Sequence, residues 1–275
     1  MKKPEIIFVD LDATLLDSKD NYTKVPSKEN LEAIERAKKA GIKVVVSTGR
    51  GINHETEYIV SKVGDLNYIA WNGAQIIHHN KLIKNFAIEK SVMQDLFNEL
   101  DKAKASFILN SDPVNHAYVR NIFMKAIMIF TKFTGKPLSD FKNDLDVFKV
   151  LVWSPSRKKV HRLWKELSKK FEGKLNVALS GHKDHALEIT APEATKGDAE
   201  VFYCNFLGIN PQNAIHIGDS GNDATTQGKI GKAVALGNSV KRYKEIADEI
   251  FEHHYKDAAV GLYINKLLDK LERSK

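Results

Sequence analysis

The stretch Ile6-Ile7-Phe8-Val9-Asp10-Leu11-Asp12-Ala13-Thr14 decides the expected fold, because a short apolar strand runs directly into two acidic residues. Residues two apart on a strand point to the same side, so Asp10 and Asp12 are predicted to face one site at the carboxyl end of the strand. Open α/β sheets bind their ligands at that edge. The alternative is a pair of exposed turn aspartates. Two adjacent carboxylates repel each other unless a cation or a shared proton relieves them, and we interpret this pair as functional.

The segments that follow alternate between helix and strand signals. Ser27 is placed to cap a helix that Gly41 ends, and residues 42–46 are a β-branched run typical of a buried parallel strand. A second helix is expected at residues 52–63 and a further strand at 68–71. This pattern predicts an α/β fold, with a doubly wound, Rossmann-like parallel-sheet core covered by helices on both faces.

The middle of the chain has a different pattern, which predicts an inserted α+β module. Helices are expected there at residues 92–103, 122–133 and 160–171, and strands at residues 107–109, 147–153, 175–179 and 186–190. After Pro192 the α/β pattern returns, with a helix at 196–207 and strands at 214–217, 233–236 and 248–251. We therefore expect a core domain of residues 1–84 and 191–275, interrupted by a module at 85–190.

Composition narrows the cellular context. The single cysteine, Cys204, cannot form an internal disulfide, which favours a reducing compartment. The first residues lack the apolar segment and cleavage site of a signal peptide. The most apolar expected helix, at residues 122–133, contains two lysines and is too short to span a bilayer. We expect a cytoplasmic protein that does not bind membranes.

A net charge of +7 raises the alternative of a nucleic-acid-binding protein. The lysines, however, are spread along the whole chain, and no basic run is interleaved with aromatic residues. A lysine-rich solvated surface explains this better, so no nucleic-acid partner is expected. The positive charge still favours small anionic substrates.

Two further motifs suggest phosphate chemistry. Ser47-Thr48-Gly49-Arg50 follows a buried strand, and a hydroxyl with the backbone N–H groups of a glycine turn suits a phosphoryl oxygen. The alternative for this motif is an ordinary strand-to-helix turn. Lys196 begins a predicted helix, where a cation is disfavoured unless an anionic partner lies nearby. It is therefore a candidate to neutralise a carboxylate nucleophile and a phosphate, although a lone surface lysine is common.

The motif Ile217-Gly218-Asp219-Ser220-Gly221-Asn222-Asp223 predicts a site for a hard cation, because acidic oxygen ligands follow a β-branched strand in a glycine-containing loop. The spacing is too short for an EF-hand. Mg²⁺ fits better than Ca²⁺, since few carboxylates are present and substrate phosphate can complete the octahedron. The histidines show no ligand-spaced cluster, which disfavours zinc.

These four motifs, in this order, resemble the haloacid dehalogenase superfamily, and within it the Cof-type hydrolases. The resemblance spans essentially the whole chain and includes Trp71-Asn72-Gly73-Ala74 and Leu236-Gly237-Asn238. It implies a Rossmann-like core, Mg²⁺ as cofactor, and a C2B-type cap formed by the inserted module, which supplies substrate specificity. One departure is Ala13, where these proteins usually have glycine. If the backbone there has positive φ, alanine costs about 1 kcal/mol.

The resemblance also implies roles residue by residue. Asp10 matches the nucleophile that becomes an aspartyl phosphate, and Asp12 matches the general acid/base, whose backbone carbonyl also binds metal. Lys196 matches the lysine that stabilises the nucleophile and the phosphate. Asp219 matches a magnesium ligand, and Asp223 a ligand or a carboxylate directly behind the ligands.

Further residues are implied on the substrate side. Thr48 aligns with the phosphate-binding hydroxyl, with Ser47 as its possible substitute and Gly49 in the same turn. Asn222 matches a contact on the phosphate side. Arg50 and Asn72 are candidates for substrate contact, because they lie on core loops expected to face the cap.

The function implied by the resemblance is a magnesium-dependent phosphatase that hydrolyses small phosphate monoesters, such as a sugar phosphate or similar metabolite. One alternative is a phosphotransferase or phosphomutase that uses the same Asp10 chemistry. Another is a non-catalytic phosphate-binding regulator, which would not need a paired nucleophile and acid. The expected partner is a small phosphorylated metabolite, and no obligate protein partner is predicted.

Overall fold

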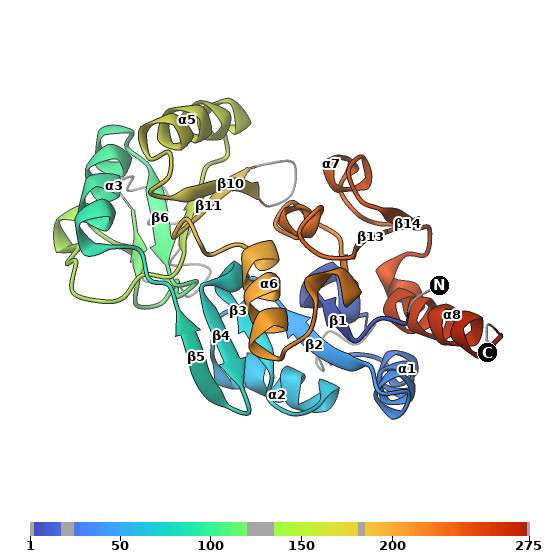
Figure 1. Ribbon diagram of the computed structural model, residues 1–275. Coiled ribbons are helices and arrows are strands. Elements are labelled where there is room, and N and C mark those ends of the chain that lie inside the picture. The colour runs from blue at the N-terminus through green and yellow to red at the C-terminus, as the bar shows by residue number, and fades with distance from the viewer. Residues whose placement is uncertain (1–2, 18–24, 120–134, 181–184, 274–275) are drawn as a thin grey trace. The chain divides into compact units, whose positions relative to one another are not determined.

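The computed structural model describes residues 3–17, 25–119, 135–180 and 185–273. The chain forms two compact units, one of Met1–Asn85 with Thr195–Lys275 and one of Phe86–Ala194 (Figure 1). The domain boundaries near residues 84 and 191, and the role of the second unit as a specificity cap, stay predictions. The helix predicted at residues 122–133 lies outside the described residues.

An eight-stranded sheet forms the centre of the first unit. Its strands are β1 (Ile6–Val9), β2 (Lys43–Ser47), β3 (Tyr68–Ala70), β4 (Gln75–His78), β5 (Lys81–Asn85), β12 (Ala214–Gly218), β13 (Lys232–Leu236) and β14 (Glu249–Phe251). They lie in the order β14-β13-β12-β1-β2-β3-β4-β5, parallel from β14 to β3 and antiparallel at β4 and β5. The predicted α/β core with a parallel sheet is confirmed.

Helices cover both faces of this sheet. They are α1 (Lys28–Lys39), α2 (His54–Val63), α6 (Lys196–Phe206), α7 (Lys241–Lys244) and α8 (Ala259–Arg273). Tyr203 and Cys204 of α6 pack in one cluster with Ile6 and Phe8 of β1. Val9, on the alternate face of that strand, is also fully buried, so the opposite face is covered as well.

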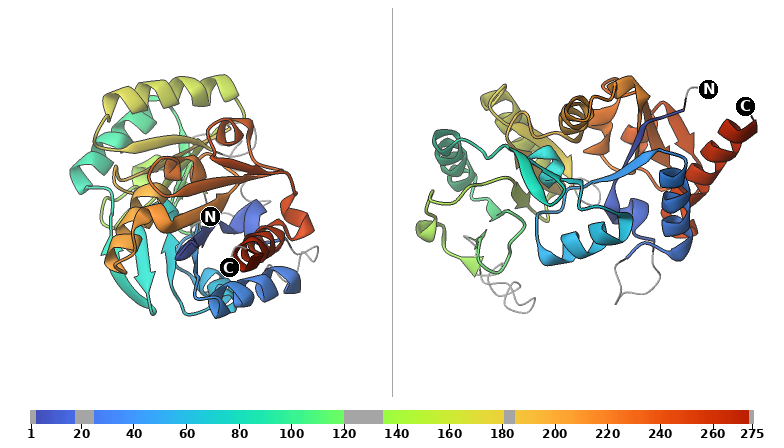
Figure 2. Two further views of the ribbon diagram at one scale, coloured as in Figure 1. Left: turned by 45° about the vertical axis from the view of Figure 1, so that its right-hand side comes forward. Right: turned by 60° about the horizontal axis from the view of Figure 1, so that its bottom comes forward.

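Local signals explain how the helices begin and how two of them meet. The Ser27 hydroxyl accepts a hydrogen bond from Asn30 N at 3.3 Å, which confirms the predicted cap of α1. The same asparagine accepts from Gly261 N at 2.7 Å, and α1 and α8 lie side by side (Figures 1 and 2). The β4–β5 hairpin and α8 were not among the predicted elements.

The second unit has a six-stranded sheet and is described by itself. Its strands are β6 (Ser106–Leu109), β7 (Ala117–Tyr118), β8 (Gly135–Lys136), β9 (Val150–Trp153), β10 (Asn176–Ser180) and β11 (Ala186–Thr190), in the order β10-β11-β9-β6-β7-β8. Its described helices include α3 (Lys90–Lys102) and α5 (Arg157–Lys170). The α5 residues Val160, Leu163 and Leu167 are buried, as their helical spacing predicts.

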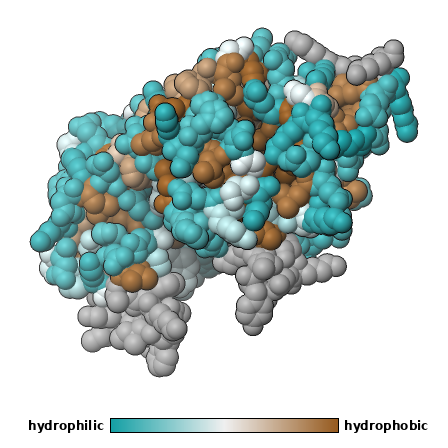
Figure 3. Space-filling view, turned by 90° about the horizontal axis from the view of Figure 1, so that it is seen from below, coloured by the Kyte–Doolittle hydropathy of each residue, from teal (hydrophilic) through white to brown (hydrophobic). Residues whose placement is uncertain are grey.

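The surface carries both hydrophilic and hydrophobic side chains (Figure 3). On the face in Figure 3, hydrophilic side chains predominate and hydrophobic ones are scattered among them. Within the part of the chain that the structure describes, no helix has both the length and the apolar character needed to cross a membrane.

Candidate active site

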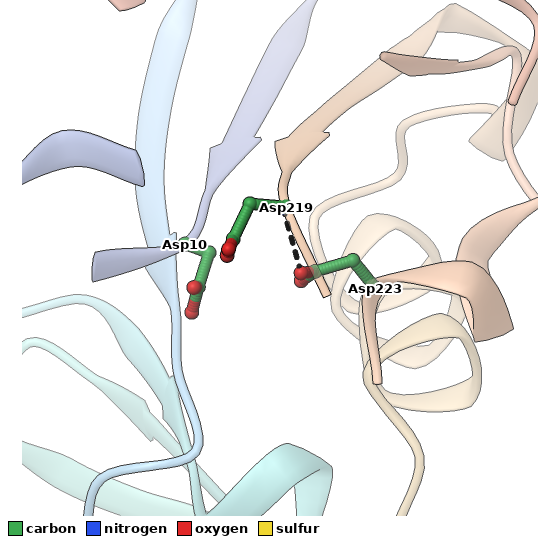
Figure 4. A group of neighbouring side chains, drawn as sticks. All are labelled: Asp10, Asp219 and Asp223. Atoms are coloured by element: carbon green, nitrogen blue, oxygen red, sulfur yellow. Dashed lines mark hydrogen bonds between the residues drawn. The ribbon is translucent and has the colours of Figure 1, made fainter. Parts of the chain in front are cut away.

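Three carboxylates meet at the carboxyl edge of the parallel sheet (Figure 4). Asp10 directly follows β1, Asp219 directly follows β12, and Asp223 begins the next helical turn. One carboxylate oxygen from each lies within 4.8 Å of the others. The backbone N–H of Asp10 donates to Ile217 O at 3.0 Å, which ties the two strand ends together. Neighbouring parallel strands therefore bring residues from distant parts of the chain to one point.

Lys196 supplies a buried positive charge to this group. Its Nζ donates to Asp10 Oδ1 at 2.6 Å and to Asp223 Oδ1 at 2.6 Å. The side chain is fully buried at the first residue of α6, which Thr195 caps by accepting from Asp198 N at 3.1 Å. The anionic partners explain why a lysine occurs at a helix N-terminus. Burial lowers the pKa of Lys196, but the charges of both aspartates outweigh it and raise the pKa above its ordinary value.

Asp223 uses both of its oxygens for hydrogen bonds. Oδ1 accepts from Lys196 and lies 3.0 Å from His216 Nε2. Oδ2 accepts from the backbone N–H groups of Asp219 and Ser220 at 3.0 and 2.8 Å. A carboxylate has about four lone-pair positions, and these contacts use all of them. Asp223 thus holds the loop that carries Asp219.

The electrostatics of the group favour an additional positive charge. Burial raises the pKa of Asp10 to about 6, and Lys196 offsets this only in part. Burial, followed by the charge of Asp223, raises the pKa of Asp219 to about 8. Burial also opposes ionisation of Asp223, but Lys196 and His216 outweigh it and hold the pKa of that carboxyl well below its ordinary value. Raised pKa values at two closely spaced carboxylates mean that their charges are incompletely compensated.

A histidine and a glutamate that the sequence interpretation missed lie behind the carboxylates. His216 Nδ1 is 2.8 Å from Glu200 Oε1, and both side chains are fully buried. Burial lowers the pKa of His216, but Glu200 and Asp223 outweigh it and raise the pKa to about 9. Two signals could have found the pair: a histidine within an apolar strand, and an acidic residue four positions after Lys196 on the same helix face.

Asp12 lies near Asp10, just after the end of the strand. The strand ends at Val9, and Leu11–Leu15 form an irregular turn in which Asp12 has extended backbone angles, with φ −72° and ψ 126°. Its carboxylate binds Arg50 in a bidentate pair, with Nε donating at 2.8 Å and Nη2 at 2.7 Å. The Asp12 charge still contributes to raising the pKa of Asp10.

The turn after Asp12 requires an unusual backbone conformation. Ala13 has a φ of 56°, a positive value that glycine would adopt at no steric cost. Asn238 Nδ2 donates to Ala13 O at 2.9 Å, and the Thr14 hydroxyl donates to Asp219 Oδ1 at 3.3 Å. These contacts hold the strained turn and link it to the carboxylate group.

The predicted phosphate loop lies at the end of β2. Thr48 Oγ1 accepts from Arg50 N at 3.1 Å, and the side chains of Ser47 and Thr48 are fully buried. Among the described residues, Ser47 Oγ has no hydrogen-bond partner. A Cβ on Gly49 would lie 2.8 Å from Asn72 Oδ1, so a larger residue here would displace the Asn72 side-chain amide.

Two asparagines join this loop to the acidic loop. Asn222 Nδ2 donates to Asn72 Oδ1 at 2.8 Å, and Ser220 Oγ donates to Asn222 Oδ1 at 2.6 Å. Asn72 has a φ of 56° and is almost fully buried. The sequence-predicted residues of the first unit are therefore connected through a continuous set of side-chain and backbone contacts.

Comparison with known proteins identifies the family. A family model described as haloacid dehalogenase-like hydrolase matches residues 7–264. The chain belongs to this family. The predicted family is thus confirmed, and the protein is an enzyme, a phosphoric monoester hydrolase of the haloacid dehalogenase type.

Two curated relatives from Bacillus subtilis (strain 168) match this hydrolase over most of their length. The 5-amino-6-(5-phospho-D-ribitylamino)uracil phosphatase YwtE is 28% identical, with 95% of this chain and 97% of the relative covered. The phosphatase YwpJ is 24% identical, with 90% of this chain and 94% of the relative covered.

A solved structure shares the fold of the hydrolase. The sugar phosphatase BT4131, described as a subclass IIB member of the superfamily, has a TM-score of 0.75 at 19% identity. The match covers 95% of this chain and 98% of that one. At this identity the likeness shows a common fold.

Proposed function

We propose that this hydrolase is a magnesium-dependent phosphatase that cleaves small phosphate monoesters through an aspartyl phosphate on Asp10. One observation carries the proposal. Asp10 is buried at the tip of a central strand, with Lys196 on one of its oxygens and Asp219 beside it. A merely phosphate-binding protein does not need a buried carboxylate at the centre of its anion site, since a carboxylate repels phosphate.

Asp10 is suited to act as the nucleophile. Lys196 holds Oδ1, and among the described residues no hydrogen bond is donated to Oδ2, which leaves this oxygen to attack phosphorus. The bond from Asp10 to phosphorus forms as the bond from phosphorus to the ester oxygen breaks. The ammonium group of Lys196 reduces the repulsion between the carboxylate and the phosphate.

The donor set fits a hard divalent cation. Its side chains offer carboxylate oxygens only, and their raised pKa values favour more positive charge. Asp10 and Asp219 would hold Mg²⁺, with the backbone carbonyl of Asp12 as the resemblance implies. Both carboxylate oxygens of Asp223 already take part in hydrogen bonds. We therefore assign Asp223 the role of holding Asp219 in position. Bound Mg²⁺ would neutralise the carboxylates and the transferring phosphoryl group.

Asp12 is the proposed general acid and base. It would protonate the leaving alkoxide in the first step and take a proton from water in the second, when water attacks phosphorus and releases Asp10. Its bidentate pair with Arg50 orients the carboxyl group before substrate binds. The phosphate side of the same site is proposed to be lined by Thr48, Ser47, Gly49, Asn72 and Asn222.

A phosphorylated sugar or sugar alcohol is the proposed class of substrate. The name of YwtE contains a phosphorylated ribityl group, and BT4131 is described as a sugar phosphatase. Both names describe a phosphate on a small polyol, and a positively charged protein favours such anions. A cytoplasmic location and the absence of nucleic-acid, membrane and obligate protein partners stay predictions.

Removal of the metal should abolish phosphate release from sugar phosphates. We expect EDTA to lower turnover at least a hundredfold, Mg²⁺ to restore it, and Ca²⁺ to restore much less, because Ca²⁺ needs more oxygen ligands. Mg²⁺ at a hundred times its Kd should also stabilise the fold by about 2.7 kcal/mol, measured by thermal unfolding.

Two controls separate the alternatives to this proposal. A phosphatase releases inorganic phosphate into solution, whereas a phosphotransferase would transfer the phosphoryl group to an added sugar acceptor. Full turnover in EDTA, with no effect of Mg²⁺ on unfolding, would contradict the metal-dependent proposal.

Replacing Arg50 with lysine should lower kcat about tenfold and leave KM nearly unchanged. Lysine keeps the charge but cannot form the two parallel hydrogen bonds to Asp12, so the general acid would lose its orientation. Glu55→Gln is the matched control, because Glu55 contacts Arg50 at 3.3 Å on another nitrogen. A rise in KM alone would instead support the substrate contact predicted for Arg50 from the sequence.

A further inference from the structure

A buried histidine and glutamate lie directly behind the carboxylates, and the proposed reaction uses neither. His216 is in the middle of β12, and Glu200 is one turn after Lys196 on α6. Ala214, two residues earlier and so on the same face of the strand, packs in an apolar cluster with Phe8 and Tyr203. The polar pair therefore interrupts a layer that apolar side chains would otherwise fill.

His216 donates a hydrogen bond to Asp223 through its Nε2 atom. Each ring nitrogen lies next to a carboxylate oxygen, Nδ1 at 2.8 Å from Glu200 and Nε2 at 3.0 Å from Asp223. An ionised carboxylate only accepts hydrogen bonds. Asp223 Oδ1 already accepts from Lys196 at 2.6 Å, so the carboxylate is the acceptor and His216 Nε2 the donor. Glu200 holds the ring in the orientation that this requires.

Fold stability does not explain the pair. Replacing a buried ion pair by apolar side chains of similar volume is often neutral or stabilising. Glu200 Oε2 is buried and has no hydrogen-bond partner among the described residues, which adds to the cost of burial. Beyond filling space, His216 and Glu200 therefore contribute the hydrogen bond from His216 to Asp223.

We propose that His216, held by Glu200, is a positioning residue for Asp223 in the reaction proposed above. Its hydrogen bond fixes the plane of a carboxylate that also binds Lys196 and the backbone of Asp219. The orientation of Asp223 therefore sets both the direction of the Lys196 ammonium toward Asp10 and the position of Asp219. This inference rests on the proposed reaction for its effect on turnover, and on the proposed metal site alone for its effect on Mg²⁺ binding.

Two matched double variants test the inference. E200Q/H216Q and E200L/H216L both remove the buried charges and keep roughly the same volume. In the glutamine pair, the amide at position 216 can donate to Asp223 and accept from the amide at position 200. In the leucine pair, position 216 offers no donor, so Asp223 Oδ1 keeps only its hydrogen bond from Lys196. The variants are compared in kcat, KM, Mg²⁺ affinity by calorimetry, and thermal unfolding.

We expect the glutamine pair to retain kcat within about threefold of the unmodified enzyme. The leucine pair should fold with equal or higher stability, yet lose about tenfold in kcat and about tenfold in Mg²⁺ affinity, with KM nearly unchanged, as expected when one hydrogen bond to a charged group is lost. Loss of activity without loss of stability is a result that a purely structural pair would not produce.

Equal kcat and equal Mg²⁺ affinity in the two double variants would overturn the inference. If the leucine pair does not fold, His216→Asn replaces it, because the shorter amide reaches toward Glu200 and leaves Asp223 without the donor. An unmodified protein that binds Mg²⁺ but releases no phosphate would refute the proposed function alone, and the Mg²⁺ affinities of the variants would still decide the positioning role.

Discussion

Asp10→Asn should abolish turnover, with a loss of at least a thousandfold in kcat for every substrate that the enzyme hydrolyses. The amide is a far weaker nucleophile than the carboxylate and cannot form the aspartyl phosphate, and removal of a nucleophile typically costs three to six orders of magnitude. Phosphate release, measured with saturating Mg²⁺ and substrate, gives kcat directly. Mass spectrometry of the acid-quenched enzyme should also show a phosphorylated aspartate only when Asp10 is present.

The fold should survive this change. Burial raises the pKa of Asp10 to about 6, above its unfolded value of 3.8, so ionised Asp10 lowers the stability of the metal-free protein at neutral pH. The neutral amide removes that cost, while Lys196 keeps its contact with Asp223. Asp269→Asn, the same substitution at a half-exposed residue that pairs with Arg36 at 2.7 Å, is the matched control. Turnover retained by Asp10→Asn would exclude Asp10 as the nucleophile.

Lys196→Met is expected to have the second large effect, on both stability and turnover. Methionine fills a similar volume but leaves Asp10 and Asp223 buried without the ammonium group that both of them contact at 2.6 Å. Removal of one partner from a buried ion pair costs about 3–5 kcal/mol of unfolding free energy. We also expect kcat to fall at least a hundredfold, since the charge of Asp10 would no longer be screened from the phosphate.

An exposed lysine offers the control for this prediction. Lys229 pairs with Asp198 at 2.6 Å, and both side chains are partly exposed to solvent. Because exposed ion pairs contribute about 0–1 kcal/mol, Lys229→Met should change stability little and leave turnover intact. Denaturant unfolding of both variants without metal measures the difference. Equal stability of the two variants would mean that Lys196 is not needed to balance the buried carboxylates.

Several parts of the site could be predicted from sequence because they follow strands directly. Asp10 and Asp219 each come after an apolar run, and the carboxyl ends of parallel strands lie at one edge of a sheet. Once the fold class was predicted, it followed that Asp10 and Asp219 lie close together. The positive φ of Ala13, at 56°, is the condition under which the sequence predicted a cost for alanine.

Other parts could not be predicted, because they depend on how separate elements pack. The bidentate pair between Asp12 and Arg50 joins two separate motifs, and no local signal in either motif indicates it. Likewise, Glu200 and His216 are each unremarkable in sequence, and only the packing of α6 against the sheet brings them to 2.8 Å.

The amino-acid sequence by itself determined the family, the α/β core and the acidic residues at its strand ends, because apolar runs, turn residues and short motifs are local signals. Only the tertiary structure decided which side chains share hydrogen bonds: Asp223 with Lys196 and His216, and Asp12 with Arg50. The physical reason is the distance along the chain over which each signal acts. A motif specifies the chemistry of its own residues, whereas the charge balance of a buried group depends on every charged partner that packing brings within about 6 Å.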